Sequence, residues 1–102
     1  MSVAGTWDLS IATPIGRLDA VVDLREQGGT LTGIAHGAGE DVPLTDLVLD
    51  DDRLTWKQAV TKPLRLNLAF DLTVTGDTLH GTSKAGRLPA SKVTGTRRPA
   101  RR

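Results

Sequence analysis

The fold of this protein is decided by one stretch of its sequence, LRLNLAFDLTVTGDTLHGTS (residues 64–83). Every second residue from position 64 to position 74 is apolar, and polar residues fill most of the positions between. A period of two residues is typical of a β-strand with one buried face. The pair Gly76-Asp77 then ends the run and Leu79 resumes it, as in a hairpin with a two-residue turn. The stretch therefore predicts two antiparallel strands that share one apolar face.

The same alternation extends along most of the chain, and turn-forming residues interrupt it at short intervals. No segment sustains the 3,4 spacing of an amphipathic helix. The expected strands cover residues 5–12, 17–27, 30–37, 42–50, 53–60, 64–75, 78–85 and 90–97. Eight short strands joined by hairpins predict an all-β fold, an eight-stranded antiparallel up-and-down β-barrel, because closure of the barrel leaves no exposed strand edge.

The register across the tight turns tests this fold, because residues paired across a hairpin point to the same face of the sheet. Two-residue turns at 28–29, 51–52 and 76–77 predict the pairs Val22–Ala35, Leu24–Gly33, Leu47–Trp56, Leu49–Leu54, Leu66–Arg87, Phe70–Ser83, Leu72–Gly81 and Val74–Leu79. The apolar faces coincide in all three hairpins. A three-residue turn at 51–52 would instead turn Asp46 and Val48 inward, in place of Leu47 and Leu49.

Length and composition limit the alternatives. At 102 residues the chain is long enough for one domain, expected at residues 1–98, followed by a basic tail at residues 99–102. The net charge of +1 and the inward placement of the aromatic residues argue against a nucleic-acid partner. There is no cysteine, so packing replaces disulfides and thiolate-bound zinc.

The chain also lacks the features of a membrane protein. Its first residues form no signal-like segment, and no apolar run approaches the roughly 20 residues of a membrane-spanning helix. We therefore expect no membrane partner and a bacterial cytoplasmic location. No residues have metal-ligand spacing, and no cofactor is predicted.

The expected barrel has two unlike ends. Tight turns close one end, a floor where the first strand begins and the last strand finishes, while the longer connections form a mouth at the other. Trp7 points inward at the floor, and Arg97 approaches it from the last strand. A guanidinium over an indole contributes about 0.5–2 kcal/mol through a cation–π interaction. Trp7 and Arg97 are therefore expected to close the floor.

At these residues the sequence resembles the calycin group of barrels, the lipocalins and avidins. Their first strand carries a Gly-x-Trp motif, matched here by Gly5-Thr6-Trp7, and in lipocalins an arginine near the last strand packs across the tryptophan, as Arg97 would. Gly5-Thr6-Trp7 followed by Leu31-Thr32-Gly33 is also similar to the first hairpins of avidin-type proteins. The resemblance implies a ligand-holding barrel. Biotin binding is not implied, because the tryptophans with which avidins enclose biotin are absent.

Polar inward side chains are expected to gather near the mouth, above an apolar wall. The polar set is Thr45, Gln58, Ser83, Arg87 and Ser91, and the wall is Trp56, Val60, Leu66, Leu68 and Phe70. A few hydrogen-bonding groups converging on an apolar cavity are typical of a small-molecule site. The alternative is an interior filled by its own side chains, which a barrel of eight strands also permits.

Catalytic residues are not identified by the sequence. His36 and His80 fall on the outer face, although a bulge could turn His36 over the mouth. Asp46 would become a candidate acid or base only in the alternative register, where burial would raise its pKa. Ser83 and Ser91 have no inward histidine to activate them, so no nucleophilic triad is predicted.

Three functions remain open at this point. The first is a binding barrel for an apolar or amphipathic small molecule, in which Trp56 and Phe70 form the walls. The second is a cyclase or isomerase that shapes a flexible substrate in the same cavity. The third is a structural or interaction domain with a filled interior. Val21, Ile34 and Val48 form an outward apolar patch that predicts a homodimer contact, unless they are scattered surface residues.

Overall fold

The computed structural model describes residues 3–13, 16–37, 39–60, 65–86 and 88–99. Within these ranges the regular secondary structure is entirely β. The strands are β1 (Gly5–Thr13), β2 (Gly16–Gln27), β3 (Thr30–Gly37), β4 (Glu40–Pro43), β5 (Thr45–Asp50), β6 (Arg53–Val60), β7 (Leu66–Thr75), β8 (Thr78–Ala85) and β9 (Ser91–Arg97). None of the described residues belongs to a helix long and apolar enough to cross a lipid bilayer.

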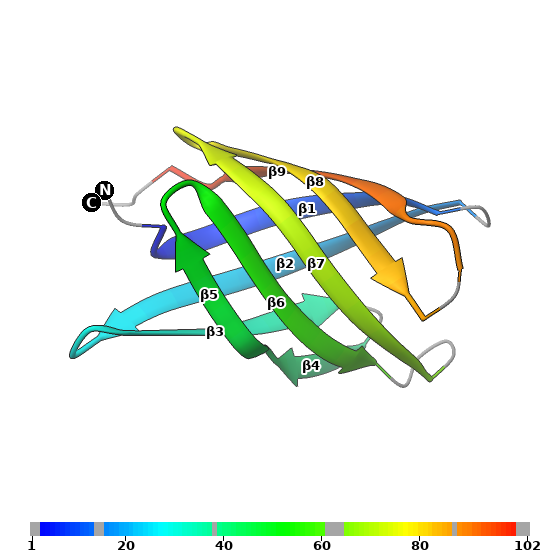
Figure 1. Cartoon of the computed structure of the whole chain (residues 1–102), viewed down its shortest axis with the longest axis horizontal. Helices are drawn as coiled ribbons and strands as arrows, with labels where there is room; N and C mark the ends of the chain where they lie inside the picture. Colours follow the sequence, from blue (N-terminus) through cyan, green and yellow to red (C-terminus); the bar gives the residue numbers. More distant parts are fainter. Residues whose placement is uncertain (1–2, 14–15, 38, 61–64, 87, 100–102) are drawn as a thin grey trace.

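The strands form a single antiparallel sheet in the order β4-β3-β2-β1-β9-β8-β7-β6-β5. β1 lies in the middle of this order because it pairs with both β2 and β9. Figure 1 shows the sheet curling until its two edges face each other. The protein is therefore a nearly closed antiparallel β-barrel.

The prediction of eight strands was wrong by one, because the expected strand 42–50 is interrupted at Leu44. Pro43 ends β4, since proline has no amide hydrogen to continue a ladder. A β-bulge follows in β5, where Asp46 has a φ of 51° and the register shifts between Thr45 and Val48. The two halves pair with different neighbours: β4 with β3, and β5 with β6.

The interruption leaves a seam between β3 and β5. The amide of Leu44 donates to the carbonyl of Gly33 at 2.9 Å, but no described residue of β5 forms a ladder with β3. Leu44 packs across the seam onto the glycine: a Cβ atom on Gly33 would lie 2.8 Å from Leu44 Cδ1 and 2.7 Å from Leu24 Cδ2. Gly33 thus makes room for the leucine that covers the seam.

The predicted register is confirmed across the β2–β3 and β7–β8 turns and for the pair next to the β5–β6 turn. Val22 pairs with Ala35, Leu24 with Gly33, Leu49 with Leu54, Phe70 with Ser83, Leu72 with Gly81 and Val74 with Leu79. The pair Leu47–Trp56 is replaced by the bulge, which places both Asp46 and Leu47 opposite Trp56. The pair Leu66–Arg87 and the side chain of Val60 lie outside the described part of the chain.

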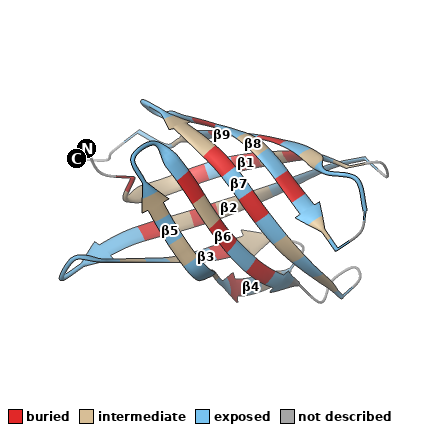
Figure 2. Ribbon diagram, in the orientation of Figure 1, coloured by how far each residue is buried: buried red, intermediate tan, exposed pale blue. Residues whose placement is uncertain are grey.

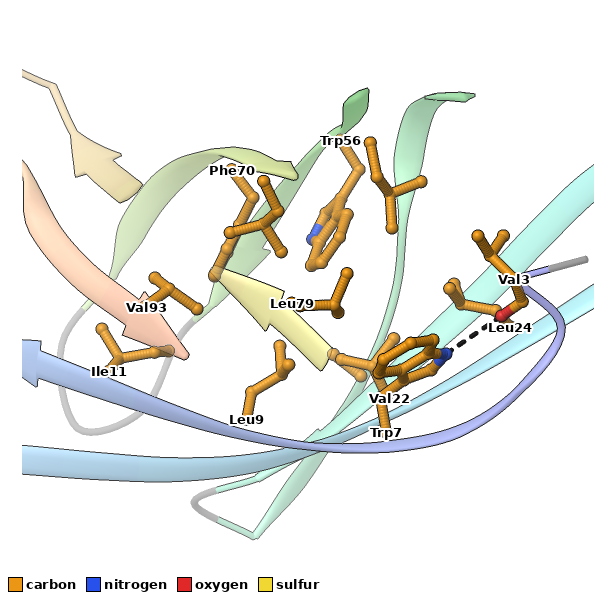
Figure 3. Close-up of a cluster of buried hydrophobic side chains, with 13 residues drawn as sticks. Val3, Trp7, Leu9, Ile11, Val22, Leu24, Trp56, Phe70, Leu79 and Val93 are labelled. Carbon is orange, nitrogen blue, oxygen red and sulfur yellow. Dashed lines mark hydrogen bonds between the residues drawn. The ribbon is translucent and has the colours of Figure 1, made fainter. Parts of the chain in front are cut away.

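The floor has the expected arrangement. Figure 1 shows the two chain ends and the tight turns after β2, β5 and β7 at one end of the barrel. Trp7 is fully buried, and the Arg97 guanidinium lies 4.7 Å from the centre of its ring. The indole NH of Trp7 donates to the carbonyl of Val3 at 3.0 Å, as Figure 3 shows. The predicted pairing of Trp7 and Arg97 is confirmed.

One apolar cluster fills the barrel from the floor upward. Its largest fully buried side chains include Trp7, Trp56, Leu54 and Leu72. Figure 2 shows the buried residues along the middle of the strands and exposed residues at the turns. This cluster is the main source of stability, because burying a large apolar side chain contributes about 1.5–3 kcal/mol.

Candidate functional site

The candidate site lies toward the end of the barrel where β2, β4, β7 and β9 begin, opposite the floor, and this end is called the wide end below. Three inward residues lie side by side on neighbouring strands there: Trp56 of β6 pairs with Phe70 of β7, and Phe70 pairs with Ser83 of β8. The rings of Trp56 and Phe70 are stacked, with centroids 4.8 Å apart and planes 15° from parallel. Trp56 is 1% exposed and Phe70 is 3% exposed, so the stacked rings form the top of the packed core.

Gln58 lies one step further toward the wide end on the same strand. It is 9% exposed, and alternation along β6 points it inward between the outward Lys57 and Ala59. The indole NH of Trp56 donates to Gln58 Oε1 at 2.9 Å. Because an indole nitrogen can only donate, this contact identifies the amide oxygen as the atom facing the indole.

The remaining polar atoms of Gln58 and Ser83 have no hydrogen-bond partner in the described part of the chain. Among the described residues, neither the amide nitrogen of Gln58 nor the hydroxyl of Ser83 is hydrogen-bonded to another group. No side-chain N or O atom in the described part of the chain is both fully covered and unpaired. The two atoms are therefore not fully covered, and a ligand or water can meet them.

Several inward apolar residues at this end are incompletely covered. Leu18 lies on the inward face, where it pairs with Ile11, yet it is 43% exposed. Leu66, Leu68 and Ser91 are half-buried. In the connection after β8, Leu88 is 57% exposed. The wide end thus combines an apolar rim with the unpaired groups of Gln58 and Ser83.

The structure brings together only part of the predicted polar set. Gln58, Ser83 and Ser91 are on the inward face, whereas Arg87 lies outside the described residues. Thr45 was expected inward but is exposed, and its hydroxyl donates to the carbonyl of Lys57 at 3.0 Å. The bulge after Thr45 adds one residue to the strand, and an added residue reverses the side on which every earlier side chain points.

The same bulge brings a residue to the interior that the sequence analysis did not single out. Leu44 is half-buried and packs against the core, in the inward position expected for Thr45. Within the expected strand 42–50, Pro43 and Asp46 were the residues that could have indicated an irregularity. They do not specify where the extra residue is inserted, so the change of face could not be assigned from sequence.

The two candidate acid or base residues lie outside the barrel. Asp46 is exposed, and its carboxylate is 3.9 Å from Lys57 Nζ. It does not point inward, because the two-residue turn at 51–52 is retained and the bulge turns Asp46 outward. His36 is on the outer face of β3 rather than over the mouth, and His80 is exposed as expected.

His36 is bound on both sides by carboxylates. Its Nδ1 lies 2.7 Å from Asp41 Oδ1, and its Nε2 lies 3.1 Å from Asp23 Oδ2. Thr6 completes the chain by donating to Asp23 Oδ1 at 2.6 Å. The Asp41 carboxylate, followed by that of Asp23, raises the pKa of His36, because both favour the imidazolium form. The Thr6 hydroxyl, with smaller help from His36, lowers the pKa of Asp23.

The outer face carries a broad, open depression beside this histidine. It has a volume of about 760 Å³ and is lined mainly by outward residues of β1, β2, β8 and β9. Asp8, Asp19, His36 and His80 contribute its titratable side chains. No group of three or more His, Asp or Glu side chains in the described ranges is arranged to hold a metal ion.

The outward apolar patch is less continuous than expected. Ile34 and Val48 are 45% and 53% exposed, whereas Val21 is half-buried. Val48 was expected on a strand next to β3, but it belongs to β5, which pairs with β6. The three residues therefore lie on both sides of the seam, and the homodimer stays a prediction.

Comparison with known proteins supports the fold and leaves the chemistry open. No protein-family model matches the sequence, and no curated protein matches it significantly. A solved structure described as a redesigned beta barrel, b11L5F_LGL, is similar to it with a TM-score of 0.67 and 16% sequence identity. The match covers 96% of this chain and 92% of the other. At this identity the similarity shows a small β-barrel fold alone.

Proposed function

We propose that this protein is a binding barrel that holds an apolar or amphipathic small molecule at its wide end. The proposal is carried by the amide of Gln58, which is 9% exposed and has an unpaired nitrogen among the described residues. A hydrogen bond from an amide to a ligand, formed in exchange for one to water, contributes about 0.5–1.5 kcal/mol. A ligand that accepts a hydrogen bond from Gln58 would replace water at this nitrogen and gain that free energy.

The ligand in this proposal sits above the core rather than in the centre of the barrel. Trp56 and Phe70 are stacked and covered, so they form the base of the site. Leu18, Leu66 and Leu68 provide incompletely covered apolar surface around it. Covering such surface with a ligand contributes about 25 cal/mol per Å². An apolar body with one polar group is the ligand that fits both parts of the site.

A filled barrel that binds no small molecule is the second candidate. It is favoured by the 1% exposure of Trp56 and the 3% exposure of Phe70, which leave the core below Gln58 without an evident binding space. The cyclase or isomerase alternative has less support from residues. Asp46 and His36 are on the outer face, so a reaction at the wide end would depend on shaping the substrate.

The experiment uses the complete chain and the NMR signals of its two indole NH groups, at Trp7 and Trp56. The ¹⁵N-labelled protein is titrated with 2-nonanone, a nine-carbon molecule with one carbonyl group. We expect the Trp56 indole and the Gln58 side-chain amide signals to shift with a common saturation curve. The Trp7 indole signal is an internal control, because Trp7 lies at the floor. Its assignment is made with Trp7→Phe.

Two results would overturn the proposal in favour of the filled barrel. The first is the absence of any saturable shift at Trp56 and Gln58 up to the solubility of 2-nonanone. The second is a shift at Trp7 as large as that at Trp56, because it would indicate a general effect of the solvent. Saturable shifts confined to the wide end support the binding barrel.

A further inference from the structure

We infer that the wide end selects ligands whose polar group is an uncharged hydrogen-bond acceptor, such as a ketone, aldehyde, ester or amide carbonyl, and that Gln58 makes this selection. The inference rests on the proposed binding function and goes beyond it by assigning the chemistry of the ligand. It follows from one hydrogen bond, between Trp56 Nε1 and Gln58 Oε1 at 2.9 Å.

The first step is the orientation of the amide. A glutamine side chain offers both an acceptor oxygen and a donor NH₂ group, and rotation by 180° exchanges them. The Trp56 indole removes this freedom, since its NH requires an acceptor and the indole is only 1% exposed. Turning the Gln58 nitrogen toward the indole would set two donors against each other and leave both unpaired. Trp56 therefore acts as a positioning residue for Gln58.

The second step is what the oriented amide presents to a ligand. With Oε1 engaged by Trp56, the group left over is the Gln58 NH₂, which has no partner among the described residues. It offers donors alone. Ser83 is 4% exposed, and its hydroxyl has no described partner. This hydroxyl can also donate a hydrogen bond to the ligand. An acceptor is thus matched by the site, whereas a second donor would meet the NH₂ unfavourably.

The third step concerns charge. The described inward residues around the wide end are uncharged, and they are Ile11, Leu18, Ala20, Val42, Gln58, Leu66, Leu68, Ser83, Ala85 and Ser91. The described basic side chains next to these residues in sequence are exposed, and they are Arg17, Lys57, Arg65, Lys84 and Lys92. A carboxylate or ammonium group carried into this apolar end would lose its hydration without gaining an ion pair from these inward residues. A neutral acceptor avoids this penalty.

The test compares three nine-carbon or ten-carbon probes of matched shape. They are 2-nonanone, 2-methyl-1-nonene, in which a CH₂ group replaces the carbonyl oxygen, and 2-aminononane, which carries an ammonium group. Affinities are measured from the Trp56 indole shift on the complete protein. One or two neutral hydrogen bonds correspond to about a tenfold higher affinity for 2-nonanone than for the alkene. We expect a larger difference in affinity between 2-nonanone and the amine.

The Gln58→Glu variant replaces the donor NH₂ group with an acceptor oxygen while keeping nearly the same side-chain volume. One carboxylate oxygen still accepts from Trp56, and the other now accepts from the ligand. We expect 2-aminononane to become the preferred probe and 2-nonanone to lose about tenfold in affinity. Gln58→Met is the second variant, because it keeps the length without a buried charge. In Gln58→Met the ketone and the alkene should bind equally well, with the Trp7 indole signal confirming a folded barrel.

The outcomes separate this inference from the proposed function. If 2-nonanone and 2-methyl-1-nonene bind the unaltered protein equally, the wide end binds ligands but Gln58 does not select them, and the inference is wrong. The inference is also wrong if Gln58→Met retains the tenfold preference for the ketone. If none of the three probes binds, the proposed function itself fails.

Discussion

Removal of the Arg97 guanidinium is the sharpest test of how the two chain ends are held together at the floor. In Arg97→Met the charge and the planar guanidinium are lost, while most of the aliphatic stem is retained. The guanidinium lies 4.7 Å from the Trp7 ring and donates to the carbonyls of Ala4 and Gly76, each at 3.1 Å. It also contacts Asp77 Oδ1 at 2.9 Å.

The expected cost follows from these contacts. The cation–π contact contributes about 1 kcal/mol at this partly exposed position, and the two bonds to carbonyls contribute about 1 kcal/mol each. The Asp77 carboxylate is 78% exposed, so its ion pair contributes less than about 1 kcal/mol. We expect Arg97→Met to lower the free energy of unfolding by about 3 kcal/mol. For a domain of this size the midpoint temperature would fall by roughly 12–24 °C.

Arg98 provides a matched control one residue away. Its side chain is 53% exposed and pairs with Asp8, which is 49% exposed. Arg98→Met removes the same charge and should cost about 0.5 kcal/mol. Arg97→Lys should fall between the two, because lysine keeps the charge and loses the planar fork. Urea unfolding followed by circular dichroism measures all three. The reasoning is refuted if Arg97→Met costs no more than Arg98→Met.

Two further predictions concern the bulge and the histidine on the outer face. Asp46 has a φ of 51°, a backbone conformation that glycine adopts easily and valine does not. Asp46→Gly should therefore change the free energy of unfolding by no more than about 0.5 kcal/mol, whereas Asp46→Val should lower it by about 1–2 kcal/mol. Equal effects of the two variants in urea unfolding would contradict the bulge. The pKa of His36 is raised in the folded state, so its contribution to stability is complete below about pH 6.5 and is lost as the pH rises through the folded-state pKa. His36→Gln should therefore lower the free energy of unfolding more at pH 5.5 than at pH 8.5. An NMR titration midpoint of the His36 imidazole at or below about pH 6.5 would show that the carboxylates of Asp23 and Asp41 do not raise its pKa.

The strand pattern was predictable because it depends on local alternation. Phe70 pairs with Ser83 and Leu24 with Gly33 as the two-residue turns require. The floor was predictable for a related reason, since the sequence places Trp7 near the start of the first strand and Arg97 near the end of the last. Once β1 and β9 pair, the two side chains meet. Alternation and turn length are short-range properties, and they were sufficient for most of the barrel.

The candidate site was predictable only in part. Gln58, Ser83 and Ser91 were placed correctly on the inward face, while Thr45 was assigned to the wrong face. The error has a physical origin, because a bulge of one residue reverses the side of every residue before it. The hydrogen bond from Trp56 to Gln58, on which the ligand chemistry depends, is a matter of side-chain rotamers. Alternation along β6 cannot specify it.

By itself the sequence determined an antiparallel barrel, its register in two hairpins and next to the turn of a third, and the Trp7–Arg97 contact, because each follows from a period of two and from turn chemistry. Only the tertiary structure decided that the expected strand 42–50 divides at Leu44 and that Asp46 faces outward. It also decided which way the amide of Gln58 is turned. These features depend on how distant strands and side chains fit together around the core, and that fit is not encoded in the spacing of residues along one strand.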